Sequence, residues 1–184
     1  ARNSIKDFFN LGVTLNNGIT LSGGTENSRT YFSYNNTYQT GLIPNNDFRR
    51  NNVMLKEAFS LFDKRVNIST SLNWIHQKTN NAPVVGKALS TLYPLYRTPA
   101  DIDMRYFKHN YKHIGTRADN IVSDPEKGNP KLAGQPVQTW YWYDQYLNNP
   151  YWVANMYNDV QKRDRIMGNI TLDAIIWKNI KYQT

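Results

Sequence analysis

Few residues in this sequence are able to hold a metal or move a proton, and their spacing does not favour catalysis. His109 and His113 stand four residues apart, which would place two imidazoles on one face of a helix. No adjacent glutamate completes the metalloprotease pattern. Asp101 and Asp103 lack the further acidic residues of a calcium loop. We expect the two aspartates to be solvated loop residues, and we predict no metal site.

Motifs for nucleophilic or nucleotide chemistry are also missing. The sequence has no Gly-x-Ser-x-Gly elbow, no phosphate-binding Gly-Lys-Ser/Thr loop and no dinucleotide fingerprint, and Gly23-Gly24 predicts a turn. It has no cysteine, which excludes thiol nucleophiles, thiolate metal sites and disulfide scaffolds. We therefore predict that the protein is not an enzyme and uses no cofactor.

Composition and charge narrow the class of protein. Hydrophobic residues make up 40% of the 184 residues and aromatic residues 14%, a mixture that suits strands with one apolar and one polar face. No apolar run approaches the roughly 18 residues of a membrane-spanning helix. The net charge is +8, but the basic pairs Arg49-Arg50, Lys64-Arg65 and Lys162-Arg163 are scattered at expected turns and strand ends. We predict no nucleic-acid partner, because such a partner requires a basic patch.

Alternation of apolar and polar residues predicts long antiparallel strands. From Val66 to Trp74, Asn and Ser occupy every odd position and mainly apolar residues the even ones, a period of two. Residues 53–62 alternate in the same way, and Asp63-Lys64 joins the two segments as a hairpin. The same construction recurs in two further hairpins, made by residues 13–22 with 32–38 and by 166–176 with 180–182.

The predicted connections alternate strictly between short and long. Short turns near 23–27, 63–65 and 178–179 are separated by longer links at 40–47 and 80–161. In an antiparallel sheet the short turns then share one edge and the long links the other, as periplasmic turns and extracellular loops do in outer-membrane barrels. The predicted regions are barrel strands in 1–79, a long extracellular loop in 80–161, and a barrel strand, a short turn and the start of the next strand in 162–184.

The predicted fold class is all-β: an antiparallel transmembrane β-barrel segment of about six strands in hairpins, with one long, irregular extracellular loop. Its strands reach the roughly 9 to 11 residues that a tilted spanning strand needs. Phe62 and Trp177 beside the short turns, and Tyr38, Phe48 and Trp74 toward the other edge, would form two aromatic girdles.

Three residues depart from the pattern. Glu57 falls on the apolar face of its strand, where contact with lipid would cost up to a few kcal/mol. A bulge, a packed neighbour or a register shift would each accommodate it, and the sequence does not choose among them. Asn17 and Asn36 are milder exceptions.

Three runs of residues stand out for their order and spacing. They are Asn17-Gly18-Ile19-Thr20-Leu21-Ser22-Gly23-Gly24, Gly41-Leu42-Ile43-Pro44-Asn45-Asn46-Asp47-Phe48-Arg49-Arg50-Asn51-Asn52 and Asn149-Pro150-Tyr151-Trp152. Together these runs resemble the barrel region of the SusC/RagA family of TonB-dependent outer-membrane transporters. The resemblance covers essentially the whole chain but only a minority of a family member.

The resemblance implies a function and a set of partners. Members of this family are multi-pass proteins of the cell outer membrane that import oligosaccharides or peptides with a SusD-like surface lipoprotein, powered through TonB. The plug and TonB box of the family have no counterpart in these residues. The sequence also lacks an initiator Met and ends in what resembles a new strand, so we expect an internal fragment of a longer polypeptide.

An aromatic cluster in the long loop is the candidate contact site that the resemblance implies. Its rings offer flat apolar faces with polar tips, which stack on sugars or bury in protein interfaces. Three interpretations stay open: contact with the lipoprotein lid, contact with the ligand, and a small core of the loop itself. The cluster consists of Trp140, Tyr141, Trp142, Tyr143, Tyr146, Tyr151 and Trp152.

A soluble β-sandwich that binds carbohydrate is the alternative function. In a sandwich the apolar strand faces would pack against one another, whereas in a barrel they would face lipid. The position of the apolar side chains in the structure therefore discriminates between these two hypotheses.

Overall fold

The structure, a computed structural model, describes residues 4–84, 86, 90–116, 132–141, 147–177 and 180–184. The chain forms two compact units. The sheet unit comprises Thr14–Gln39, Phe48–Lys78 and Gln161–Thr184, and the loop unit comprises Ala1–Val13, Thr40–Asp47 and Thr79–Val160. In the described part of the chain, no helix is both long and apolar enough to cross a membrane.

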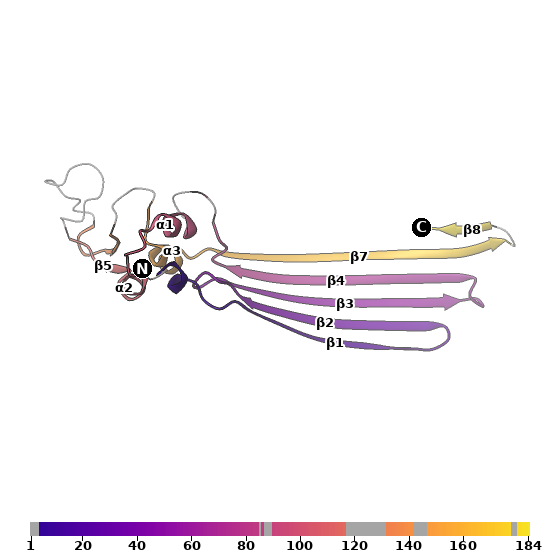
Figure 1. The fold of residues 1–184 in the computed structure, drawn as a ribbon. Helices are drawn as coiled ribbons and strands as arrows, with labels where there is room; N and C mark the ends of the chain where they lie inside the picture. The colour runs from indigo at the N-terminus through magenta and orange to yellow at the C-terminus, as the bar shows by residue number, and fades with distance from the viewer. Residues whose placement is uncertain (1–3, 85, 87–89, 117–131, 142–146, 178–179) are drawn as a thin grey trace. The chain divides into compact units, whose positions relative to one another are not determined.

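Six strands follow one another in a single sheet, in the order β1-β2-β3-β4-β7-β8 (Figure 1). The predicted all-β, antiparallel class is confirmed. The five strands from β1 to β7 are 12 to 18 residues long. The strand bounds are β1 Val13–Gly24, β2 Ser28–Thr40, β3 Asp47–Leu61, β4 Val66–Asn80, β7 Val160–Trp177 and β8 Ile180–Gln183.

Cross-strand hydrogen bonds show that the register is constant across β1, β2, β3, β4 and β7, whereas the pairing of β7 with β8 has an irregularity between Ile175 and Trp177. Between β2 and β3, Thr30 bonds to Glu57 and Asn36 bonds to Asn51. The two bonded positions are six residues apart on each strand, so no residue is inserted or skipped between them. Because side chains alternate with a period of two, a constant offset keeps the same two faces on every strand. Other pairs with constant offsets are Asn16–Thr37 (β1, β2) with Thr25–Ser28 at the adjoining turn, Ser60–Asn67 and Asp47–Asn80 (β3, β4), and His76–Asp164 (β4, β7) with Arg65–Ile175 just before β4.

The apolar face of the sheet unit is exposed. Leu21 is 58% exposed and Ile170 75% exposed, although both are large aliphatic side chains. Within the described residues of this unit, no second layer packs on this face, so its side chains are not interlocked between stacked sheets. The exposed large side chains of this face are Leu15, Ile19, Leu21, Tyr34, Leu55, Phe59, Leu61, Leu72, Trp74, Ile166, Ile170 and Ile176.

Glu57 finds a polar partner on the apolar face. The Thr30 hydroxyl on β2 donates a hydrogen bond of 2.9 Å to Oε2 of Glu57 on β3. The register between these two strands is the same at Asn36 and Asn51, so no slip separates the two positions. The sequence left a bulge, a packed neighbour or a register shift open as explanations for Glu57. The structure shows a neighbour, Thr30, that is hydrogen-bonded to it.

The other polar exceptions fall into one cross-strand row on the apolar face. The constant register aligns Asn17, Asn36, Asn51, His76 and Asp164 on five adjacent strands. Nδ2 of Asn36 donates to Oδ1 of Asn51 over 2.8 Å, and Nδ1 of His76 lies 2.7 Å from Oδ1 of Asp164. The polar groups of this row are therefore largely satisfied by one another, which lowers the cost of removing them from water.

Two of the predicted short turns are seen in full. Residues 25–27 join β1 to β2, and residues 62–65 join β3 to β4. In the second turn Phe62, Asp63 and Lys64 all have positive φ, between 52° and 66°. This backbone is unusual for residues other than glycine. The third predicted turn, at 178–179, lies outside the described residues.

The aromatic residues at the strand ends match the predicted girdles only in part. Phe62 and Trp177, at the ends of β3 and β7 that lie beside short turns, are 74% and 73% exposed. Tyr38 and Trp74 lie on the apolar face toward the opposite ends of β2 and β4. Phe48 occupies an even position of β3, and the constant register assigns the even positions to the polar face. The prediction that Phe48 belongs to a girdle is therefore wrong.

The loop unit is a small folded body with its own core. Its elements are short: η1 Ser4–Phe8, α1 Leu92–Arg97, α2 Met104–His109, β5 Lys112–Ile114, β6 Pro136–Gln138 and α3 Pro150–Met156. β5 and β6 pair antiparallel. The buried core joins segments that are distant in the sequence, with Phe8, Ile43, Leu95, Met104, Phe107, Trp140 and Tyr151 in contact.

We expect the 184-residue chain, expressed by itself in buffer, to aggregate. Its sheet exposes an apolar face, and β1 and β8 lie at the ends of the described strand order, where backbone groups can pair with other chains. Size-exclusion chromatography with light scattering measures this directly, with a parallel sample in non-ionic detergent as the control. A monodisperse monomer that melts cooperatively in detergent-free buffer would contradict the expectation.

Candidate functional site

The predicted aromatic cluster divides between core and surface. Trp140 and Tyr151 are buried, with 4% and 2% exposure, and both belong to the core of the loop unit. Tyr141 and Trp152 are half-buried, so each keeps some exposed ring area. The remaining members, Trp142, Tyr143 and Tyr146, lie outside the described residues.

The two buried rings are fixed by contacts with other rings, which are edge-to-face with Phe107 and Phe8 and tilted with Tyr141. The Trp140 ring lies 4.8 Å from the Phe107 ring and 4.5 Å from the Tyr141 ring, measured between centroids. The Tyr151 ring lies 5.0 Å from the Phe8 ring at 62°. Such contacts add about 0.5 to 1.5 kcal/mol each beyond the area that they bury. Trp140 and Tyr151 therefore act as structural anchors of the loop unit.

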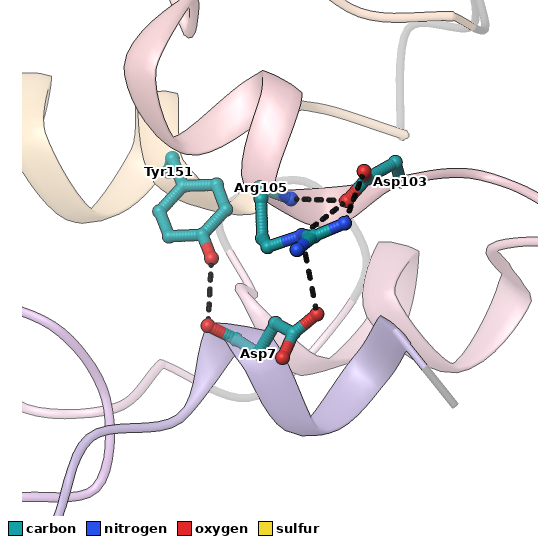
Figure 2. A network of polar contacts seen from close by, with 4 residues as sticks. All are labelled: Asp7, Asp103, Arg105 and Tyr151. Atoms are coloured by element: carbon teal, nitrogen blue, oxygen red, sulfur yellow. Dashed lines mark hydrogen bonds and ion pairs between the residues drawn. The ribbon is translucent and has the colours of Figure 1, made fainter. Parts of the chain in front are cut away.

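A polar network surrounds the hydroxyl end of Tyr151 (Figure 2). The Tyr151 hydroxyl donates to the backbone oxygen of Asp7 over 3.1 Å. Nε of Arg105 lies 4.0 Å from the Asp7 carboxylate, and Arg105 also bonds to both carboxylate oxygens of Asp103. Burial, and then the charge of Asp7, raise the pKa of Tyr151 to about 12, so its hydroxyl stays protonated at neutral pH. The network joins η1 to α2 and α3.

Asn149 makes several hydrogen bonds at the start of α3. It is fully buried, and its Oδ1 accepts the backbone N–H of Tyr151 as the N-cap of the helix. Its Nδ2 donates to the backbone oxygen of Thr139, and its own N–H donates to Oε1 of Gln138. Pro150, in the first turn of the helix, needs no N–H there. One side chain thus holds α3 against the strand segment that leads to Trp140.

The residues considered for catalysis have structural environments. Asp103 caps α2 by accepting the N–H of Arg105, whereas Asp101 is exposed. His109 ends α2, and Nδ1 of His113 lies 2.9 Å from the Thr139 hydroxyl. In the part of the chain that the structure describes, no group of three His, Cys, Asp or Glu residues is placed to hold a metal.

The polar face of the sheet unit carries a pocket of about 700 Å³ beside the turn from β1 to β2. The Lys56 ammonium lies 5.7 Å from the centre of the Tyr31 ring, and the Ser71 hydroxyl bonds to Oδ1 of Asn169. These groups offer hydrogen-bond donors and acceptors, an aromatic face and positive charge, which suit a polar ligand such as a sugar or peptide. The polar, charged and aromatic side chains that line this pocket include Arg29, Tyr31, Lys56, Ser69, Ser71 and Asn169.

Sequence reasoning did not find this pocket. Alternation predicts which residues share a face, but not which residues of distant strands lie opposite one another. Ser71 and Asn169 are 98 residues apart and meet only because β7 pairs with β4 across the long loop. The available signal was the predicted strand order, which implies this pairing without its exact offset.

No protein-family model matches the chain, and no curated protein matches it. The two faces of the sheet and the packing of the loop unit are therefore the observations from which a function is argued. They define an antiparallel sheet with one exposed apolar face and one polar, pocketed face.

Replacing Asn149 with alanine should destabilise the loop unit by about 2 to 3 kcal/mol, because a helix cap is lost and a buried backbone oxygen loses its donor. Denaturant unfolding of the chain in non-ionic detergent, followed by tryptophan fluorescence, measures the effect. Asn158→Ala, at an exposed asparagine, is the matched control and should change stability by less than about 0.5 kcal/mol. Equal losses in the two variants would show that Asn149 has no special role.

The raised pKa of Tyr151 predicts a specific loss of stability in alkali. Its contribution is fully present below pH 10, the ordinary pKa, and is lost as the pH rises through about 12, since the ionised form is disfavoured in the folded state. Tyr151→Phe should remove this contribution and cost about 1 kcal/mol at neutral pH through the lost hydrogen bond. Denaturant midpoints of the two proteins in non-ionic detergent between pH 9 and 12 provide the test, and identical pH profiles would refute it.

Proposed function

We propose that this chain forms part of the barrel of a TonB-dependent outer-membrane transporter of the SusC/RagA kind, which imports oligosaccharides or peptides with a SusD-like surface lipoprotein. The exposed apolar face of one continuous antiparallel sheet carries the proposal. A monomer in water rarely exposes more than a few hundred Å² of contiguous apolar surface. In an outer membrane, acyl chains cover such a face while the opposite, polar face lines a water-filled lumen.

The dimensions of the apolar face fit a bilayer. On β3 the apolar side extends from Val53 to Leu61, which is about 26 Å along the strand at roughly 3.3 Å per residue. On β4 the register places Trp74 and Val66 opposite these two ends. A strand tilt of about 40° reduces this height to roughly 20 Å, close to the apolar band of about 25 Å in outer-membrane barrels.

The basic and aromatic residues at one end of the apolar face also support the proposed membrane location. Beyond the row that contains His76 and Asp164, the next cross-strand row carries Arg49, Lys78 and Lys162 on neighbouring strands. The Arg49 guanidinium lies 5.0 Å from the centre of the Tyr38 ring. Basic and amphipathic aromatic side chains are favoured where acyl chains give way to anionic headgroups.

The loop unit has the role of an extracellular loop in this proposal, because its segments connect the strand ends that are not joined by short turns. Its buried aromatic residues maintain its shape, and the exposed parts of Tyr141 and Trp152 remain for contact with the lipoprotein lid or the substrate. Energy coupling through TonB would use a plug region that these residues do not resemble.

Single-cysteine spin labels on β4 test the proposal in native outer membranes. The chain has no cysteine, so each variant carries one label. Labels at Ile68, Thr70 and Leu72, on the apolar face, should collide with lipid-soluble oxygen. Labels at Ser69, Ser71 and Asn73, on the polar face, should collide with a water-soluble nickel complex. The adjacent positions control one another for depth and local mobility.

The labels also separate the transporter from a soluble sandwich. In a sandwich the even-numbered labels would be shielded from both relaxation agents, because they would lie between two packed sheets. Uniform accessibility to the nickel complex at all six positions, or absence of the protein from the outer-membrane fraction, would overturn the proposed function.

A further inference from the structure

Three arginines gather at a small cavity on the polar face of the sheet unit. Arg50 of β3 and Arg163 and Arg165 of β7 line a cavity of about 220 Å³, together with Ile75 and Gln77 of β4. We call these three arginines the arginine cluster. The cluster lies on the same face as the larger pocket beside the β1–β2 turn but toward the other ends of the strands.

The register explains why these residues meet. The constant offsets place Arg50, Gln77 and Arg163 directly opposite one another in a single cross-strand row. Arg165 is two residues along β7 from Arg163 and faces the same side, opposite Ile75. Neighbouring strands are about 4.8 Å apart, so the long guanidinium side chains can converge over Gln77.

The positive charges of the cluster are not neutralised by a carboxylate among the described residues. None of the three guanidinium groups has a hydrogen bond or ion pair within the described part of the chain. Asp164 lies between two of them in the sequence, but it faces the opposite side of the sheet and pairs there with His76. Three like charges therefore share one cavity without a protein counter-ion.

The surroundings of the cluster suit an oxyanion. Guanidinium groups present paired N–H donors that match carboxylate, sulfate and phosphate oxygens. The Gln77 amide offers a further donor in the same row. Ile75 is only 8% exposed and forms an apolar floor beneath the charged groups. An anion above this floor would meet several donors at once, and it would relieve the repulsion among the three charges.

We propose that the arginine cluster binds the oxyanion group of an anionic ligand. In the transporter, this site would favour acidic oligosaccharides or acidic peptides over neutral ones. The choice of substrate class rests on the proposed function, whereas anion binding itself depends only on the cluster.

An NMR titration tests anion binding directly. The protein is purified as it occurs, in a non-ionic detergent, and the backbone amide shifts of residues 75–77 are followed during additions of sodium sulfate, phosphate or acetate. Sodium chloride keeps the ionic strength constant. We expect saturable shifts with at least one of these oxyanions. The anion that binds with the highest affinity identifies the preferred group.

Matched variants locate the site. The triple variant R50Q/R163Q/R165Q should raise the apparent Kd of the preferred anion at least tenfold. The control R49Q/K78Q/K162Q removes three positive charges from the same strands on the opposite face, and it should change the Kd less than about twofold. The variant R50K/R163K/R165K keeps the charge but loses the paired donors, so it should bind with intermediate affinity. If the glutamine variant does not fold, this lysine variant tests the proposal in its place.

Two results would overturn the site. The first is the absence of saturable shifts in the parent protein, and the second is equal weakening by the glutamine triple and the control triple. Equal affinity of the lysine triple and the parent would show that the cluster acts only as diffuse positive charge, which also contradicts the proposal.

A second arm tests the substrate class. A trimer of galacturonic acid should bind at least tenfold more tightly than its neutral methyl ester, and the glutamine triple should abolish this difference. Equal binding of acid and ester would refute the proposed selectivity. The titrations report on the arginine cluster alone and the spin labels on the membrane placement, so the failure of one is distinguishable from the failure of the other.

Discussion

The constant register of the sheet is the constraint on which the other features depend. Because side chains alternate with a period of two, a slip of one residue between any two strands would exchange the apolar and polar faces from that point onward. Bonds at both ends of the β3–β4 and β4–β7 pairs have unchanged offsets, so the faces remain separate from β3 to β7, and the offset changes only where β7 pairs with β8. The continuous separation of the faces leaves one surface apolar and the other polar, which is the arrangement that the proposed function requires.

Polar side chains on the apolar face lie where the register places a hydrogen-bonding residue on the adjacent strand. Glu57 receives a hydrogen bond from Thr30 on the adjacent strand, and His76 lies beside Asp164 in the same way. A buried or lipid-facing polar group is costly chiefly when it is unsatisfied. Residues that seem to break the sequence pattern are thus compatible with the apolar face through cross-strand pairing rather than through local distortion of the backbone.

Alternation and turn chemistry are local properties, and they predicted the strands, the two described short turns and the antiparallel class from the sequence. Long-range offsets are not local. The basic pairs Arg49-Arg50 and Lys162-Arg163 are far apart in the sequence, yet the register divides each pair between two faces and brings Arg50 near Arg163. Distance from the strand end predicts which edge of the sheet Phe48 lies near, but only its even position in β3 determines that it lies on the polar face. The long segment after β4 has no periodicity, so its helices were not predicted, and its core, which contains Trp140 and Tyr151, was only one of three interpretations of the aromatic cluster.

The core of the loop unit has a consequence for the order of folding. Phe8 packs on Tyr151, and the Tyr151 hydroxyl bonds to the backbone of Asp7, 144 residues earlier in the chain. Ile43 joins the same core from the connection between β2 and β3. Contacts of such sequence separation carry a high loop-closure cost and form slowly. The first residues of this body must therefore wait for the last ones to be synthesised, and hairpins such as β3–β4 can form while its core is still open.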